Sequence, residues 1–278
     1  MKKIVESFHS WDEEDIEFLA KYGIIIKLGS GRIRFDYDER YPEIRSYFKN
    51  KYYSSDVIAY EYSKEEFDNS EYYILNGIYG CGFPQPEKDY KYKSLCFDIN
   101  KICPVCGCGR EQINDLRIRK VAKHGIFGYS AWLHDELFVH KEVYEEIFAP
   151  LGVNKRSVIK GGKILEDVFQ LVIPVIDESI YLADREFEIC PLCGEVKYSM
   201  QHYAYPFFPL HKNPLPGIYK TKEYFGAGQG LKAQRIIFIS KDVADKLLKR
   251  KDIKDYFLIP CRRENNKSPQ YIPCNVFL

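Results

Sequence analysis

The sequence Ile102-Cys103-Pro104-Val105-Cys106-Gly107 is repeated almost unchanged as Ile189-Cys190-Pro191-Leu192-Cys193-Gly194. Cys-Pro-x-Cys-Gly is the backbone signature of a zinc knuckle. A strand ends at the first cysteine, the proline fixes φ in the turn, and the glycine permits the positive φ that directs the second sulfur to the metal. Tetrahedral zinc needs four ligands, and the two motifs supply four thiolates. The sequence therefore predicts one structural zinc site formed by Cys103, Cys106, Cys190 and Cys193.

Two separate metal sites are the alternative to this shared site. Each would need further ligands near its own motif: Cys108 and His124 lie near the first motif, and His202 lies near the second. The shared site is favoured because Cys108 has no counterpart, since position 195 is a glutamate. A dithiol redox centre is disfavoured, because redox Cys-x-x-Cys motifs begin a helix. Here the first motif runs into Gly107-Cys108-Gly109, which is a poor helix start.

The composition indicates a β-rich, nearly neutral protein. The 278 residues are 45% hydrophobic and include 23 tyrosines and 18 phenylalanines, which suit pleated surfaces. Lysine and arginine total 41 against 40 acidic residues, so the basic excess of a general nucleic-acid binder is absent. We expect a cytoplasmic location, because no apolar run could span a bilayer, no signal peptide is visible and nine cysteines do not form an even disulfide framework. The cysteines outside the motifs are expected to be buried or incidental thiols: Cys81, Cys96, Cys108, Cys261 and Cys274.

The fold class predicted by these patterns is α+β. An N-terminal α/β segment, 1–80, precedes a Gly/Pro-rich loop at 80–93 and a larger body, 93–278. Within the segment, a capping box at Ser10 and Glu13 predicts a short helix that stops at Gly23. The other predicted elements are a β-hairpin of 24–28 and 33–37 about a turn at 29–31, a helix over 41–50, and strands over 56–62 and 71–75.

The larger body is predicted to be duplicated. Leu137 to Val143 matches Ile237 to Val243 at a constant shift of 100 positions (237 minus 137), and each copy reads as strand, helix, strand. Ser240 is the expected N-cap of the second helix. Each half, about 93–176 and 177–278, is then a strand, a knuckle and a strand–helix–strand unit joined by the zinc site. Chance similarity of apolar patterns is the alternative.

The residues that carry these patterns resemble those of the double-CXXCG-motif family, which includes immunity-type proteins of bacterial polymorphic toxin systems. The resemblance spans roughly residues 71–262 and implies a cytosolic protein that protects its producer by binding one cognate toxin. Metal ligands transfer only to the four matched cysteines, and no catalytic residues come with the family. Besides the paired motifs, the resemblance rests on Gln112, on Trp132 followed by Asp135-Glu136-Leu137-Phe138-Val139, and on Arg235-Ile236-Ile237-Phe238-Ile239-Ser240.

We therefore expect a non-enzymatic binding protein, an immunity protein, with structural zinc and a protein toxin as its partner. The aromatic insert Tyr198 to Gln234 is a candidate binding surface, although rings that close the core are the more usual case. A zinc-ribbon nucleic-acid-binding protein is the alternative. It would use Lys249-Arg250-Lys251, Arg262-Arg263 and the basic residues Arg117, Arg119, Lys120 and Lys123, but acidic residues interrupt any phosphate track.

Enzymatic motifs are missing from the sequence. The six histidines form no HExxH or HxH cluster, and neither a Gly-x-Ser-x-Gly elbow nor a phosphate-binding loop occurs. His134 and Asp135 could be a catalytic fragment, but a lone histidine beside a strand is more often surface or satisfied core. The glycine-rich stretch Gly226-Ala227-Gly228-Gln229-Gly230 is read as a flexible turn.

Overall fold

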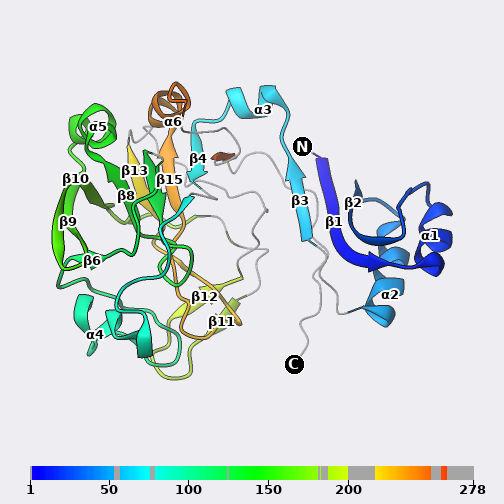
Figure 1. Cartoon of the computed structure of the whole chain (residues 1–278), viewed down its shortest axis with the longest axis horizontal. Coiled ribbons are helices and arrows are strands. Elements are labelled where there is room, and N and C mark those ends of the chain that lie inside the picture. Colours follow the sequence, from blue (N-terminus) through cyan, green and yellow to red (C-terminus); the bar gives the residue numbers. More distant parts are fainter. Residues whose placement is uncertain are drawn as a thin grey trace. The chain divides into compact units, whose positions relative to one another are not determined.

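The computed structural model describes residues 2–52, 57–75, 79–123, 125–180, 182, 187–199, 217–251 and 258–261; of these, the side chains of 57–60 and 79 are not described. The described residues fall into two compact units, 2–69 and 70–261 (Figure 1). The architecture is mixed α+β with several sheets and few helices, as the sequence predicts. None of the described helices is long and apolar enough to cross a membrane.

The first unit is a three-stranded antiparallel sheet, in the order β2-β1-β3, covered by two helices. Its core contains Val5, Trp11, Leu19 and Phe48. The elements are β1 (Lys2–Trp11), α1 (Glu13–Ala20), β2 (Gly29–Asp36), α2 (Tyr41–Lys51), β3 (Val57–Glu61) and α3 (Lys64–Asp68).

Two predictions for this unit are wrong in detail. Residues 24–28 form no strand, and β2 pairs instead with β1, in a register that sets Trp11 opposite Gly29. Ile25 is 93% exposed, so the apolar run was not a buried strand. The capping box of α1 uses Asp12 and Asp15, because β1 continues to Trp11 and passes through Ser10. The predicted helix over 41–50 and the strand over 56–62 are confirmed.

The second unit is built on three sheets, and it begins at Ser70. Strand β4 therefore pairs within this unit, although the sequence analysis places it in the segment 1–80. The elements before the second cysteine motif are β4 (Tyr72–Leu75), β5 (Tyr79–Gly80), η1 (Lys88–Tyr90), α4 (Tyr92–Cys96), β6 (Leu116–Arg117), β7 (Ile126–Gly128), β8 (Leu137–His140), α5 (Lys141–Val143), η2 (Tyr144–Phe148), η3 (Ala149–Leu151), β9 (Asn154–Lys160), β10 (Lys163–Val172) and β11 (Phe187–Ile189). Those after it are β12 (Val196–Tyr198), β13 (Ile218–Lys220), β14 (Tyr224–Phe225), β15 (Ile237–Ser240), α6 (Lys241–Leu248) and β16 (Leu258–Pro260).

The strand orders are β5-β7-β8-β10-β9-β6, β13-β15-β4-β16 and β11-β12-β14. In Figure 1, α5 and α6 lie together at one end of the unit, and an ion pair of 3.0 Å joins Arg250 to Glu146 there. Helix α4 and strands β11 and β12 lie toward the other end of that view. The loop predicted over 80–93 contains the η1 turn and the start of α4.

The two helical segments bury the residues that their apolar pattern predicts. Val143, Ile147 and Phe148 are buried in the first, and Val243 and Leu247 in the second, whereas Leu248 of the same apolar stripe is half-buried. Ser240 occupies the N-cap of α6, as predicted, but its hydroxyl makes no capping hydrogen bond to the helix. It contacts the backbone of Gly217 and the carboxylate of Asp242 instead.

Candidate metal centre

The four predicted ligands meet at one place in the second unit. The sulfur atoms of Cys103, Cys106, Cys190 and Cys193 all lie within 4.8 Å of one another. Cys103 Sγ is 3.7 Å from Cys190 Sγ, and Cys106 Sγ is 3.5 Å from Cys193 Sγ. A tetrahedron of sulfurs about 2.3 Å from a central ion has edges of about 3.8 Å. The cluster therefore has the dimensions of a four-thiolate metal site.

The two motifs share one backbone conformation. Gly107 N–H donates to the carbonyl of Cys103, and Gly194 N–H donates to that of Cys190, each at 2.9 Å. The glycines have φ of +80° and +77°, as the knuckle prediction requires. Strand β11 leads into Cys190, but no strand leads into Cys103, so the prediction that a strand precedes each knuckle is wrong for the first.

The backbone turn favours ionisation of the first cysteine of each motif. The N–H groups of Cys106 and Val105 act on the Cys103 sulfur and lower its pKa to about 6. The N–H groups of Cys193 and Leu192 lower the pKa of Cys190 in the same way. Burial instead raises the pKa of Cys106 to about 12. A cation among the sulfurs is what would allow all four to be thiolates, because metal binding releases thiol protons.

A fifth cysteine belongs to the same buried cluster. Cys108 is 2% exposed and packs with Cys103, Cys106 and Cys190. Its carbonyl accepts the N–H of Cys103 at 2.9 Å, and Glu195 does the same for Cys190. The other candidate ligands of the two-site alternative, His124 and His202, lie outside the described residues. Cys81 and Cys96 are buried as expected, Cys261 is partly buried, and Cys274 lies outside the described residues.

Sequence reasoning missed a buried cation beside this cluster. Lys197 on β12 is fully buried, and its Nζ forms an ion pair of 2.7 Å with Glu188 on β11. The same Nζ donates to the carbonyls of Gly226 and Gly230, at 3.2 and 2.7 Å. These contacts tie the glycine-rich turn to the second knuckle. The burial of Lys197 could not be expected from the sequence, because lysines are rarely buried. The one sequence feature that pointed to this residue is its nearness to Cys193.

The residues behind the family resemblance form buried polar contacts. Asp135 is 3% exposed and accepts two hydrogen bonds from Arg110, at 2.7 and 2.9 Å. It also accepts the backbone N–H of Arg235 at 3.2 Å. Burial would raise the pKa of Asp135, but the charges of Arg110 and Lys220 lower it. The carboxylate of Asp135 therefore takes part in a buried ion pair with Arg110.

A second network lies next to this ion pair. The side-chain amides of Gln112 and Gln170 exchange two hydrogen bonds, of 2.8 and 2.7 Å. Gln170 also donates to Glu136 at 2.9 Å, and Lys220 forms an ion pair with Glu136 at the same distance. Because every charge in the network has a partner, these residues hold segments of the body together.

The candidate surfaces from the sequence are only partly described. In the insert Tyr198 to Gln234, Phe225 is fully buried and Tyr224 packs under Arg235, whose guanidinium lies 4.1 Å from the ring centroid. These rings favour the interpretation that the insert closes the core. Of the basic residues, Arg250 is ion-paired with Glu146, and Arg262 and Arg263 lie outside the described residues.

Comparison of the sequence with protein-family models and with curated proteins finds no match.

Proposed function

We propose that this protein is a non-enzymatic binding protein, an immunity protein that neutralises a cognate protein toxin, held together by one structural zinc ion. The observation that carries the structural part is the convergence of four cysteine sulfurs within 4.8 Å. Four thiolates favour zinc, which prefers soft ligands in a tetrahedron. Four protein ligands leave no position for water or substrate, which is the arrangement of a structural site and not of a catalytic one.

The zinc ion would join segments that are distant in the sequence. Each knuckle alone offers two ligands, so the ion is fully coordinated only when both knuckles are in place. Its binding free energy then becomes part of the folding free energy. Cys103, Cys106 and Cys190 are buried, which shields the metal from competing ligands, and Cys193 is exposed.

We also propose that the body is duplicated, with one strand exchanged between its halves. The order β7-β8-β10-β9 corresponds to β13-β15-β4-β16, and every neighbouring pair in both series is antiparallel. In this correspondence β10 of one sheet matches β4 of the other. The first half then begins at β4 and the second at β10, instead of at residues 93 and 177. Strand β10 of the second half lies in the sheet of the first half, and β4 of the first half lies in the sheet of the second.

The exchange explains how the knuckles meet. Two equivalent halves that exchange one strand pack about a pseudo-twofold axis. Equivalent loops of the two halves approach each other near such an axis. The ion pair between Glu146 of η2 and Arg250, two residues after α6, is consistent with two equivalent helices beside the axis. A zinc ion shared between two equivalent knuckles fits the same arrangement.

The immunity role rests on the family resemblance and on the absence of catalytic motifs from the sequence. Its test is affinity capture of the tagged full-length protein from its native cytoplasm at moderate salt, with mass spectrometry and a parallel nucleic-acid stain. We expect one stoichiometric protein partner that carries a toxin domain and loses its toxicity in the complex. Recovery of nucleic acid without a protein partner would contradict the proposal and favour the zinc-ribbon alternative.

A further inference from the structure

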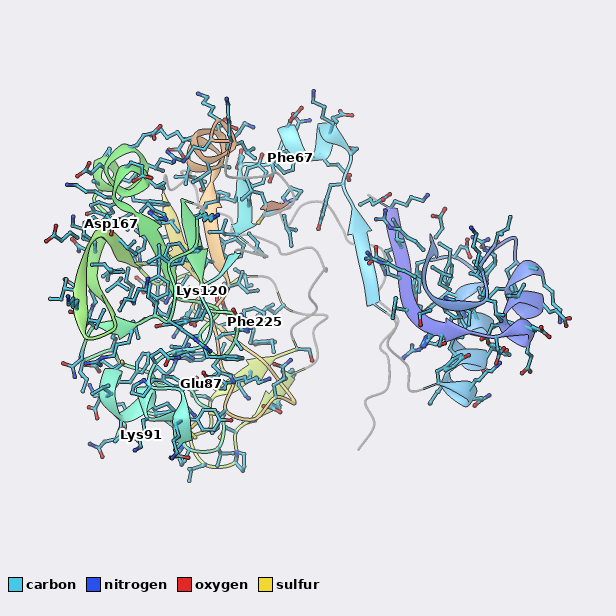
Figure 2. All side chains as sticks on the ribbon, in the orientation of Figure 1. Phe67, Glu87, Lys91, Lys120, Asp167 and Phe225 are labelled. Atoms are coloured by element: carbon cyan, nitrogen blue, oxygen red, sulfur yellow. The ribbon has the colours of Figure 1, made fainter. Side chains whose placement is uncertain are left out.

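A pocket of about 230 Å³ lies beside the first knuckle. Its walls come from η1 and α4, from the loop around Trp132, and from the chain that follows the glycine-rich turn, where Leu231 lines it. Figure 2 labels Glu87 and Lys91, the residues that flank η1, and so locates this wall. The pocket is smaller than the roughly 300 Å³ at which sites for drug-sized ligands begin, so it fits one side chain and not a cofactor.

Aromatic rings form one side of the pocket. The Trp132 ring lies parallel to Tyr92, with 5.7 Å between centroids, and is 4.8 Å from Tyr90. Trp132 and Tyr90 have φ of +72° and +53°, and with Asp89 they are the non-glycine residues of the described chain with positive φ. Strained backbone of this kind gathers at sites that clamp a ligand. The rings offer a flat, pre-organised surface to an apolar or aromatic group.

The charges that line the pocket are all positive. Lys93, Arg110 and Lys232 line it, and no carboxylate does. Arg110 is neutralised by Asp135 behind the wall. Among the described residues, neither Lys93 nor Lys232 has an ion-pair partner. Lys93 Nζ lies 5.1 Å from the centroid of the Tyr90 ring, so its ammonium group is held at the aromatic wall. The pocket therefore combines an apolar interior with two ammonium groups that no carboxylate neutralises, and it is complementary to an apolar group flanked by negative charge.

We propose that this pocket binds one aromatic side chain of a protein partner, with acidic residues next to it in the partner's sequence. The inference depends on the proposed binding function and names the site and the chemistry of the partner segment. A protein segment fits better than a nucleic acid, which needs a track of basic groups along its backbone. Next to the first knuckle, Lys101 is already paired with Glu111, so it adds no unpaired cation on that side of the pocket.

The pocket and the metal centre share a residue of the first knuckle. Gly107 of the first knuckle lines the pocket and packs against the backbone of Leu231. The ammonium group of Lys197 donates a hydrogen bond to the carbonyl of Gly230, the residue before Leu231. Loss of the metal would release the first knuckle from Leu231, so the metal centre supports the shape of the binding site.

The test measures peptide binding by the zinc-loaded full-length chain. The probes are acetyl-Glu-Phe-Glu-amide, acetyl-Gln-Phe-Gln-amide and acetyl-Glu-Ala-Glu-amide, with uridine monophosphate as the nucleotide probe. Trp132 is one of two tryptophans, so its fluorescence reports occupancy, and equilibrium dialysis gives the affinity. We expect the first peptide to bind at least roughly fivefold more tightly than the other probes, and the K93Q/K232Q double variant to lose that preference. The control is K160Q/K163Q, which removes two exposed lysines of the β9–β10 hairpin and should bind as the wild type does.

Equal binding of the three peptides, tighter binding of uridine monophosphate, or no saturable binding at about 10 mM would overturn the pocket proposal. The failure of the proposed function is a different result. A captured toxin that binds K93Q/K232Q as well as the wild type keeps the immunity function and overturns this site. Selective peptide binding without any captured protein partner keeps the site and contradicts the immunity function.

Discussion

Gly107 and Leu231 are in direct backbone contact at the metal centre: a Cβ atom at Gly107 would lie 2.3 Å from the carbonyl oxygen of Leu231. The equivalent glycine of the second knuckle, Gly194, has no atom of the described residues within 4 Å of its Cβ position. The two knuckles share one conformation but differ in their surroundings. Of the two glycines, Gly107 is the one whose Cβ position is blocked by backbone, and this asymmetry provides a matched pair of substitutions.

We predict that Gly107→Ala is much more destabilising than Gly194→Ala. Both substitutions place a side chain at positive φ, which destabilises by about 1–2 kcal/mol. Only G107A also forces the backbone of Leu231 away, which should add about 2 kcal/mol or more and loosen the zinc. Urea unfolding and zinc retention of the two variants check this. Equal losses of stability would contradict the packing of the first knuckle on Leu231.

Replacement of a ligand should destabilise the whole second unit. We expect Cys103→Ser and Cys190→Ser each to lose bound zinc and to lower the melting temperature sharply, because metal binding contributes to folding. Cys108→Ser is the control, since Cys108 lies in the same buried cluster but is not one of the four. It should keep the zinc and lose only about 1 kcal/mol. A folded, zinc-free C103S protein with an unchanged melting temperature would show that metal binding does not stabilise the fold.

The buried Lys197 should be required for the glycine-rich turn and the second knuckle. Four thiolates around zinc carry a net charge of about −2, and a nearby buried ammonium offsets part of it. Lys197→Met leaves Glu188 and the carbonyls of Gly226 and Gly230 without their donor, so we expect a loss of about 2–4 kcal/mol in the free energy of unfolding. Glu188→Gln, at a more exposed position, should lose less. Chemical denaturation at constant zinc measures both.

Asp15 should make the first unit sensitive to acid. Burial would raise its pKa, but hydrogen bonds from Tyr52, the Asp12 N–H, Lys51 and Tyr47 lower it to about 2, well below the usual range of an aspartate. A carboxyl whose folded pKa is depressed contributes stability above its unfolded pKa, and this stability is lost as pH falls from about 4 to about 2. The fluorescence of Trp11, in the same core, reports unfolding when Trp132 is replaced by Phe. In that background, D15N should reduce the pH dependence in this range, the rest coming from groups such as Asp38, whose pKa the Arg40 guanidinium also lowers. An unchanged slope would contradict the assignment.

The exchange of β4 and β10 predicts cooperative unfolding of the second unit. If each sheet contains a strand from both halves, neither half is complete by itself. Hydrogen exchange at increasing urea should therefore show β8 and β15 losing protection at the same concentration. Loss of protection in one of these strands well before the other would indicate two independent halves.

The convergence of the four cysteines was predictable from the sequence, and their surroundings were not. Cysteine spacing encodes coordination directly, so the two motifs identify Cys103, Cys106, Cys190 and Cys193 without knowledge of the fold. Partner choice in a sheet is non-local, which is why β2 was assigned to the wrong strand and the pairing of β4 with β15 was not expected. The burial of Lys197 depends on chain segments that meet only after folding.

The most direct test of the central claim is the metal content and coordination of the purified full-length protein. Elemental analysis combined with X-ray absorption at the zinc edge gives both the stoichiometry and the ligand set. The shared site predicts about one zinc per chain with four sulfur neighbours at about 2.3 Å. About two zinc ions per chain with nitrogen or oxygen ligands, or a metal-free protein with its cysteines oxidised to disulfides, would contradict it.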